Sequence, residues 1–353
     1  MAGRIVIFGA TGYTGTLTAR ALVAQGARPV LAGRNAEALR VLADELGGLE
    51  TARADVNDPR SVRALVERND VLVTTVGPFA EYGRAALDAA VDAGAHYLDS
   101  AGEPPFIREV FECYGPRARS ALVTAFGYDY VPGNLAGALA LDRVGEEGFR
   151  VDIGYFVGGG ELVRGLSAGT LESAAGMVAA RMYTFRGRIV EERRPRVRDF
   201  AVAGRSRAGL SIGASEHFGL PASYRALYEV NVYLGWFGRA TRLAAVLPRG
   251  RVVAAGVRLS GGALARLARR RSTKSTLTSR IVAAAYDSAG SLLTEVHLSG
   301  GDPYDFTARI LSWGACQAAC GMAETGALGP VGAFGLSELE AACAMAGISR
   351  VSG

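Results

Sequence analysis

Three glycines near the start of the chain have the spacing of a dinucleotide-binding loop. The segment GATGYTG runs from Gly9 to Gly15, directly after a β-rich run and before a helical pattern. In such a loop Gly9 allows a tight turn, Gly12 lets the backbone approach a pyrophosphate, and Gly15 permits close helix packing. The amides and partial positive charge of the helix N-terminus favour a phosphate. A purely structural turn is the alternative, but the place between strand and helix favours a binding loop.

The end of the next β-rich run indicates which dinucleotide is bound. An NAD site usually has an Asp or Glu here to accept the ribose hydroxyls, whereas this chain has Gly33, Arg34 and Asn35. A carboxylate would repel a 2′-phosphate, while a guanidinium binds it with two charge-assisted hydrogen bonds. The sequence therefore predicts NADP(H). The alternative is an arginine that merely follows a strand in an arginine-rich chain.

Two later segments are expected at the same edge of the sheet. Asp55 follows the third β-rich run and is predicted to meet the adenine, and Gly77-Pro78-Phe79 follows the fourth, where the nicotinamide half usually lies. Both predictions rest on strand order, because ligands bind at the carboxyl ends of parallel strands. Asp55 could equally be the N-cap of the following helix.

The elements that must position these residues alternate over the first 145 residues. The β-rich runs are Arg4–Phe8, Pro29–Ala32, Glu50–Val56, Asp70–Val76, His96–Asp99 and Ala121–Phe126. The helical patterns are Gly15–Gln25, Ala36–Leu46, Pro59–Arg68, Glu81–Ala93 and Phe106–Arg119. Strands alternating with helices of this length predict βαβ units, and so an α/β fold with a Rossmann-type doubly wound parallel sheet.

The rest of the chain follows another pattern. Strand-like runs at Val151–Val157, Arg251–Leu259, Ile281–Tyr286 and Leu292–Leu298 succeed one another without regular crossover helices. This is typical of an antiparallel α+β domain. Its predicted helices are Thr170–Tyr183 and Phe306–Met322. We therefore expect a NADP(H)-binding domain at 1–145, an α+β substrate or dimerisation domain at 146–305, and a C-terminal helical segment at 306–353 that returns to the first domain.

Composition excludes several classes of protein. The net charge of +5 could suggest nucleic acid, but the 39 basic residues are spread along the chain among 34 acidic ones, and Lys274 is the only lysine. We read this skew as coding bias and expect no nucleic-acid partner. No run of 18 apolar residues and no signal peptide occurs, so a cytoplasmic protein without an integral membrane segment is expected.

Several motifs together resemble one family. They are GATGYTG, LAGRN, TTVGPFAEYG (74–83), AGAHYLDSAGE (93–103), FGYDYVPGN (126–134) and GPVGAFG (329–335). The chain is similar to the saccharopine dehydrogenase-like NADP-dependent oxidoreductases, the group with saccharopine reductases and trans-acting enoyl reductases. The resemblance implies a cofactor site formed by Gly9, Thr11, Gly12, Tyr13, Thr14, Arg34, Asp55, Gly77, Pro78, Phe79 and Gly102.

The resemblance also implies a set of residues in the substrate cleft. These are Tyr82, Glu103 and Tyr128, and together with Asp129 and Tyr130 they are the candidates for donating a proton to the reduced bond. Each has an ordinary structural alternative, such as packing or capping. The family commonly has GFDSVPSD where this chain has GYDYVPGN at Gly127–Asn134, and this departure predicts an unusual substrate.

Other chemistries do not fit the residues. A short-chain dehydrogenase needs a Tyr four residues before a Lys, but Arg270 has that place before Lys274. No zinc or other metal site is predicted, because the three histidines are isolated and the cysteines lack CxxC spacing. No GxSxG motif of a serine hydrolase occurs.

The sequence therefore predicts an NADPH-dependent reductase of a C=C or C=N bond in a small molecule. The alternatives are a non-catalytic dinucleotide-sensing regulator and a subunit that presents cofactor to a partner enzyme. The segment SAGTLESAAGM (167–177) could line the substrate pocket or could only form a turn. The segment RLARRRSTK (266–274) could hold the phosphate of a carrier phosphopantetheine or of coenzyme A, or it could be a solvated loop. The aromatic stretch Tyr224–Phe237 could cover an apolar substrate, form core, or be the seam of a homodimer.

Overall fold

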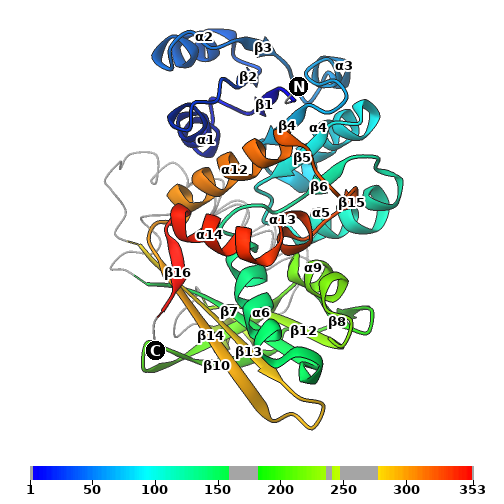
Figure 1. Cartoon of the computed structure of the whole chain (residues 1–353), viewed down its shortest axis with the longest axis vertical. Coiled ribbons are helices and arrows are strands. Elements are labelled where there is room, and N and C mark those ends of the chain that lie inside the picture. The colour runs from blue at the N-terminus through cyan, green and yellow to red at the C-terminus, as the bar shows by residue number, and fades with distance from the viewer. Residues whose placement is uncertain (1–2, 159–181, 236–240, 247–276, 352–353) are drawn as a thin grey trace. The chain divides into compact units, whose positions relative to one another are not determined.

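The computed structural model describes residues 3–158, 182–235, 241–246 and 277–351 (Figure 1). The chain divides into two compact units, each made of several segments. The first unit contains Met1–Ala101, Phe106–Val131 and Tyr304–Ala333. The second contains Gly102–Pro105, Pro132–Pro303 and Phe334–Gly353. The segment after 303 is thus shared between the units.

The first unit is built on a seven-stranded parallel sheet in the order β15-β6-β5-β4-β1-β2-β3. This order confirms the predicted Rossmann-type sheet and places the change of winding direction between β1 and β4. The strands are β1 (Ile5–Phe8), β2 (Val30–Gly33), β3 (Thr51–Arg53), β4 (Val71–Thr74), β5 (His96–Asp99), β6 (Ala121–Val123) and β15 (Gly326–Ala327).

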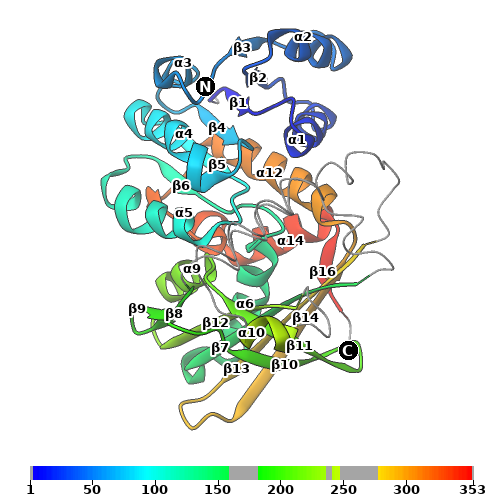
Figure 2. The ribbon, with the colours of Figure 1, turned by 180° about the vertical axis from the view of Figure 1, so that it is seen from behind.

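Helices cover both faces of this sheet. Figures 1 and 2 show α1, α2 and α12 on one face and α3, α4 and α5 on the other. The helices are α1 (Tyr13–Ala24), α2 (Ala36–Glu45), α3 (Pro59–Arg63), α4 (Phe79–Ala93), α5 (Pro104–Glu109), α12 (Pro303–Cys320) and α13 (Pro330–Phe334). Because both faces are covered, the strands β1, β4 and β5 are buried along their whole length.

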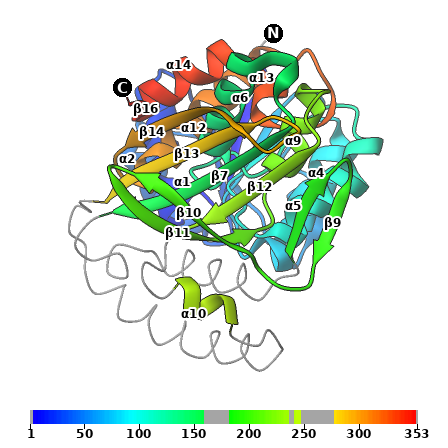
Figure 3. The same cartoon turned by 90° about the horizontal axis from the view of Figure 1, so that it is seen from below.

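The second unit contains a nine-stranded mixed sheet, along which β10, β11, β12, β7, β13, β14 and β16 follow one another (Figure 3). The pair β12–β7 is parallel and the other pairs are antiparallel, so the predicted antiparallel pattern is wrong at that pair. The strands are β7 (Arg150–Gly158), β8 (Met182–Arg186), β9 (Ile189–Glu192), β10 (Val197–Val202), β11 (Arg205–Ile212), β12 (Glu229–Leu234), β13 (Thr278–Tyr286), β14 (Leu292–Gly300) and β16 (Ile348–Arg350).

Part of the predicted aromatic stretch belongs to the core of this sheet. Tyr233 is 4% exposed and packs in a cluster with Phe156, Phe200, Val202 and Val282. Tyr228, by contrast, is half exposed and stacks on Phe149 with ring centroids 5.0 Å apart. Trp236 and Phe237 lie outside the described residues. The described aromatic side chains therefore form packing contacts of the sheet.

The helices of the second unit are α6 (Val131–Val144), α9 (Glu216–Ser223), α10 (Thr241–Val246) and α14 (Leu336–Ala346), with a short 3-10 turn at Gly145–Glu147. The sequence predicted none of α6, α9 and α10. Residues 131–141 of α6 are all buried. Because this stretch is buried on every side, it has no clear amphipathic period by which the sequence pattern could reveal it.

Three predicted helices are wrong in part. The pattern at Pro59–Arg68 forms only the short helix α3, which ends at Arg63. The pattern at Phe106–Arg119 is not one helix: α5 ends at Glu109, a π turn covers Val110–Tyr114, and a 3-10 turn covers Gly115–Arg117. Pro116 has no amide hydrogen to donate, so a regular α-helix cannot run on to Arg119. In the predicted helix Thr170–Tyr183, the last two residues instead begin strand β8. The remainder of that helix, the run 251–259, and the segments 167–177 and 266–274 lie outside the described residues.

Candidate functional site

The glycine loop is held tightly against the end of β4. Gly9 has φ +93°, and a Cβ there would lie 2.9 Å from both Thr75 Oγ1 and Val76 Cγ2. A Cβ on Gly15 would lie 2.2 Å from the carbonyl oxygen of Gly9. The hydroxyl of Thr75 donates to the same carbonyl at 3.2 Å. Gly9 and Gly15 are therefore required by the fold of the loop itself.

Gly12 is placed differently, at the open start of α1. It occupies the N-cap with φ −74° and ψ 166°, and no side chain caps the helix. Thr11, Gly12 and Tyr13 are exposed, while Thr14 is half-buried. A Cβ on Gly12 would meet only the Gly9 carbonyl, at 3.3 Å. The start of the helix therefore presents backbone to solvent in the way that pyrophosphate binding requires.

Tyr13 adds an aromatic group to this surface. Its side chain is 61% exposed, and its ring lies edge-on to Tyr304 at the start of α12, with centroids 5.2 Å apart. Tyr304 comes from a segment almost 300 residues away along the chain. The contact therefore fixes one side of the exposed ring beside the glycine loop.

The predicted 2′-phosphate segment lies at the end of β2. Gly33 is buried, and the exposed Arg34 follows it with no ion pair or hydrogen bond to any residue that the structure describes. The side-chain oxygen of Asn35 accepts a hydrogen bond from the amide of Ala38 at 3.1 Å, so Asn35 caps α2. At this place, an exposed arginine without an ion pair to any described residue fits a phosphate.

Asp55 organises the turn after β3. Its carboxylate accepts hydrogen bonds from the amide and the side-chain nitrogen of Asn57, at 2.9 and 3.0 Å. The N-cap of α3 is Asp58, so Asp55 does not cap that helix. Asp55 remains half-buried at the carboxyl end of β3, where a contact with adenine stays a prediction.

The segment after β4 turns into α4 through a cis Gly77-Pro78 bond. Gly77 is exposed and Phe79 is buried, packing on Phe106 with centroids 5.7 Å apart. Tyr82 is half-buried in the first turn of α4. Gly77 is thus the accessible part of this turn, next to the glycine loop across β4 and β1.

A buried carboxylate that sequence reasoning missed joins the ends of β5 and β6. Asp99 is fully buried, and its oxygens accept from the amides of Ala101 and Ala125 at 2.8 and 2.6 Å and from the hydroxyl of Thr124 at 2.8 Å. Burial raises the pKa of Asp99 to about 6, against the lowering effect of these hydrogen bonds. The motif AGAHYLDSAGE contains this residue, but two of its three partners, Thr124 and Ala125, lie 25 and 26 residues further on.

The segment after β6 carries three of the proposed proton donors. Tyr128 is 3% exposed, its amide donates to the hydroxyl of Thr307 at 2.9 Å, and its ring lies edge-on to Phe306. Asp129 is half-buried, and Tyr130 is buried with φ +92°. A positive φ is unusual for a bulky side chain, and such strain often accompanies a functional site. The structure brings these three residues together at the carboxyl edge of the parallel sheet.

Gly102 and Glu103 belong to the second unit. Glu103 is 5% exposed, and its carboxylate accepts from the amide of Gly102 at 3.1 Å. Tyr128–Tyr130, in contrast, belong to the first unit. Their predicted roles at the cofactor and in the cleft stay predictions.

A second buried polar cluster contains Gly133 and Asn134, two of the positions where the sequence differs from the family pattern GFDSVPSD. The Gly133 amide donates to the Tyr155 hydroxyl at 2.8 Å, which donates to Glu216 at 2.6 Å. A Cβ on Gly133 would lie 2.1 Å from that hydroxyl. Asn134 donates to Ser215 at 3.0 Å. The departure is therefore coupled to residues that fill the space beside α6, and no larger residue fits at Gly133.

His217 lies beside this cluster. It is 1% exposed, and burial lowers its pKa to about 4, so its ring is neutral at pH 7. Its Nδ1 lies 3.1 Å from the amide nitrogen of Ala214. Among the described residues, no three His, Cys, Asp or Glu side chains are grouped as a metal site would need.

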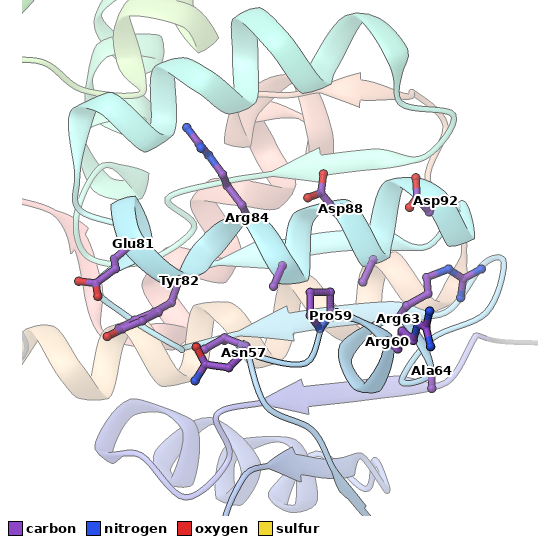
Figure 4. A pocket seen from close by; sticks show the side chains of 13 residues that line it. Asn57, Pro59, Arg60, Arg63, Ala64, Glu81, Tyr82, Arg84, Asp88 and Asp92 are labelled. Carbon is purple, nitrogen blue, oxygen red and sulfur yellow. The ribbon is translucent and has the colours of Figure 1, made fainter.

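A groove of about 850 Å³ lies between α3 and α4 (Figure 4). Figure 4 shows Tyr82 beside Asn57 at one end of it, and Arg60 and Arg63 toward the other. Tyr82 is the one predicted site residue among its lining residues. On its α4 wall Arg84 pairs with Glu109 and Asp88 with Arg117, whereas Glu81 and Asp92 have no ion pair to a residue that the structure describes. With one predicted site residue in its lining, this groove is not assigned to the substrate.

The first unit thus has the features of a dinucleotide-binding domain of the Rossmann class: a switch in strand order, a glycine loop and an uncapped helix at one edge. Residues 5–126 match the family model of the saccharopine dehydrogenase NADP binding domain. This match confirms the predicted resemblance over these residues and NADP(H) as the cofactor of the domain.

Two comparisons extend this result. A trans-acting enoyl reductase of Mycobacterium ulcerans is 35% identical over 153 residues, 41% of this chain and 37% of that protein. One of Mycobacterium tuberculosis is 36% identical over 140 residues, 37% of this chain and 34% of that protein. The chain thus spans about a third of the length of these relatives.

Structural similarity covers more of the chain than sequence similarity does. Saccharopine dehydrogenase (L-Glu forming) of Saccharomyces cerevisiae has a TM-score of 0.61 and 11% sequence identity, covering 99% of this chain and 100% of that one. At this identity the likeness establishes the fold alone. Among the described residues, none of the helices combines the length and apolar character needed to cross a membrane.

Proposed function

We propose that the protein is an NADPH-dependent reductase that transfers hydride to a C=C or C=N bond of a small molecule. One observation carries the proposal: the exposed, uncapped start of α1 at Gly12 lies at the same sheet edge as Arg34, which has no acidic partner among the described residues. The first would hold the pyrophosphate and the second the 2′-phosphate. The names of the relatives favour reduction of an enoyl C=C bond.

The chain's own residues would bind the cofactor, orient the nicotinamide and donate a proton to the substrate. Bound NADPH supplies the hydride. The glycine loop would hold the pyrophosphate at Gly12, in a shape that Gly9 and Gly15 make possible, and Gly77-Pro78-Phe79 would border the nicotinamide. The proton for the other end of the reduced bond would come from the segment Tyr128–Tyr130, with Tyr82 and Glu103 as the other candidates.

Oxidation of NADPH by candidate acceptors tests this proposal. We would follow the loss of NADPH absorbance with two panels, α,β-unsaturated acids together with their coenzyme A thioesters, and cyclic imines. Oxidation with a thioester but not with its free acid would support a carrier-linked or coenzyme A-linked substrate. Tight NADPH binding without turnover on either panel would favour the dinucleotide-sensing or cofactor-presenting alternatives. Sedimentation at several concentrations tests the proposed homodimer.

The proton donor can be located with three conservative variants. Tyr128→Phe, Asp129→Asn and Tyr130→Phe each remove a proton or a charge with little change in volume. A general acid contributes about 100-fold or more to turnover, so the donor's variant should lower kcat strongly while KM changes little. Wild-type kcat in all three variants would move the donor to Tyr82, Glu103 or water.

A further inference from the structure

We infer that Arg53, at the end of β3, forms the second half of the 2′-phosphate site with Arg34. The inference rests on the proposed NADPH cofactor and deepens it, because it names the residue that would strengthen the preference for NADPH over NADH. Arg34 follows the end of β2, and the pairing of β2 with β3 places Arg53 next to that end.

The strand register places Arg53 beside the end of β2. The strands are parallel, Gly33 is paired with Arg53, and the amide of Ala54 donates to the Gly33 carbonyl at 3.0 Å. Paired positions on neighbouring strands lie about 4.8 Å apart and project from the same face of the sheet. Arg53 therefore projects from the face on which Gly33 lacks a side chain.

The space beside Gly33 is open. A Cβ built there would have a single neighbour within 4 Å, Leu39 Cδ2 at 3.9 Å. In an NAD site a carboxylate from the end of the second strand would fill this space and accept the ribose hydroxyls. In this chain the space is left free, and the arginine on the next strand projects to the same side.

The charges also favour a shared anion. Arg34 and Arg53 are both exposed, and neither has an ion pair or hydrogen bond to a described residue. The acidic residues of the nearby helix are engaged elsewhere, since Arg40 pairs with both Glu37 and Asp44. Two neighbouring cations repel each other, whereas a phosphate monoester, with a charge of about −1.5 to −2, would attract both.

The test measures the affinities of NADPH and NADH for wild type and for Arg34→Ala, Arg53→Ala and Arg53→Gln by calorimetry. Adenosine 2′-phosphate and adenosine 5′-phosphate serve as small probes of the same site. Arg205→Ala is the matched control, because Arg205 is also exposed and without an ion pair in the described chain, but lies in the β10–β11 hairpin. Arg205→Ala removes the same positive charge as Arg53→Ala.

We expect Arg53→Ala and Arg53→Gln to weaken NADPH and adenosine 2′-phosphate about tenfold, since a hydrogen bond to a charged group is lost. NADH and adenosine 5′-phosphate should change less than twofold, and Arg205→Ala should leave all four affinities unchanged. If wild type prefers NADPH and Arg53→Ala keeps that preference, the inference is overturned while the cofactor assignment stands. If wild type binds both cofactors equally, both are overturned.

Discussion

The two ends of the carboxyl edge of the parallel sheet differ in how their polar groups are used. At the end formed by β1, β2 and β3, Gly12, Arg34 and Arg53 are exposed, and neither arginine is paired within the described chain. At the end formed by β5 and β6, the Asp99 carboxylate is fully buried and accepts three hydrogen bonds from its own chain. The first end therefore leaves polar groups available for a ligand. At the second end the carboxylate stabilises the loops after β5 and β6, and the loop after β6 leads to the proposed proton donors Tyr128–Tyr130.

The largest expected effect comes from removing the buried carboxylate. Asp99→Ala leaves two amides and one hydroxyl without an acceptor in a dry place, and should lower the free energy of unfolding at pH 7 by about 3 to 4 kcal/mol. Asp99→Asn keeps an acceptor and the volume, and should cost less than about 1 kcal/mol. Denaturant unfolding checks both. Equal, small losses would show that Asp99 does not hold the two loops.

The pH dependence of stability should reveal the same residue. The folded-state pKa of Asp99 is about 6 and the ordinary value is 3.8, so the folded chain holds the proton more tightly than the unfolded chain. The stabilisation is therefore full below pH 3.8 and is lost as pH rises through about 6. Between about pH 4 and 7, wild type should lose about 3 kcal/mol relative to Asp99→Asn. Parallel stability curves would contradict this pKa.

At the open end, the largest effect is expected at Gly12. Gly12→Val places a side chain where the pyrophosphate would lie, and should weaken NADPH about 100-fold, which is about 2.7 kcal/mol. The melting temperature should hardly change, because a Cβ there has only the contact at 3.3 Å. Gly15→Val is the matched comparison, and its clash at 2.2 Å should destabilise the fold as well. Unchanged NADPH affinity in Gly12→Val would make the loop a simple turn.

A smaller effect is expected at Arg34. Arg34→Ala should weaken NADPH by about ten- to a hundredfold and remove most of its advantage over NADH, because charge-assisted bonds to the 2′-phosphate contribute about 1.5 to 3 kcal/mol. Stability should stay within about 0.5 kcal/mol, as expected for an exposed residue. Competition binding with both cofactors gives the ratio, and an unchanged ratio would argue for NAD.

Sequence reasoning succeeded where the signal is local. The glycine loop, the strand before it and the helix after it are contiguous, so their spacing alone identified them, and six predicted runs became the strands β1 to β6. It failed where a segment is buried on all sides, and where pairing with a distant strand sets the secondary structure. The helix α6 is buried on all sides and shows no period, and Tyr183 extends β8 because that strand pairs with β9 and β12.

The sequence by itself determined that a Rossmann-type domain with a phosphate-binding loop occupies the first part of the chain. Glycine spacing and alternation of strand and helix are short-range properties, and they can be read without knowing the fold. Only the tertiary structure decided that Asp99 joins loops 25 residues apart, that Tyr13 meets Tyr304, and that Arg53 is paired with Gly33. Those contacts depend on strand pairing and helix packing, which bring together residues that no local pattern connects.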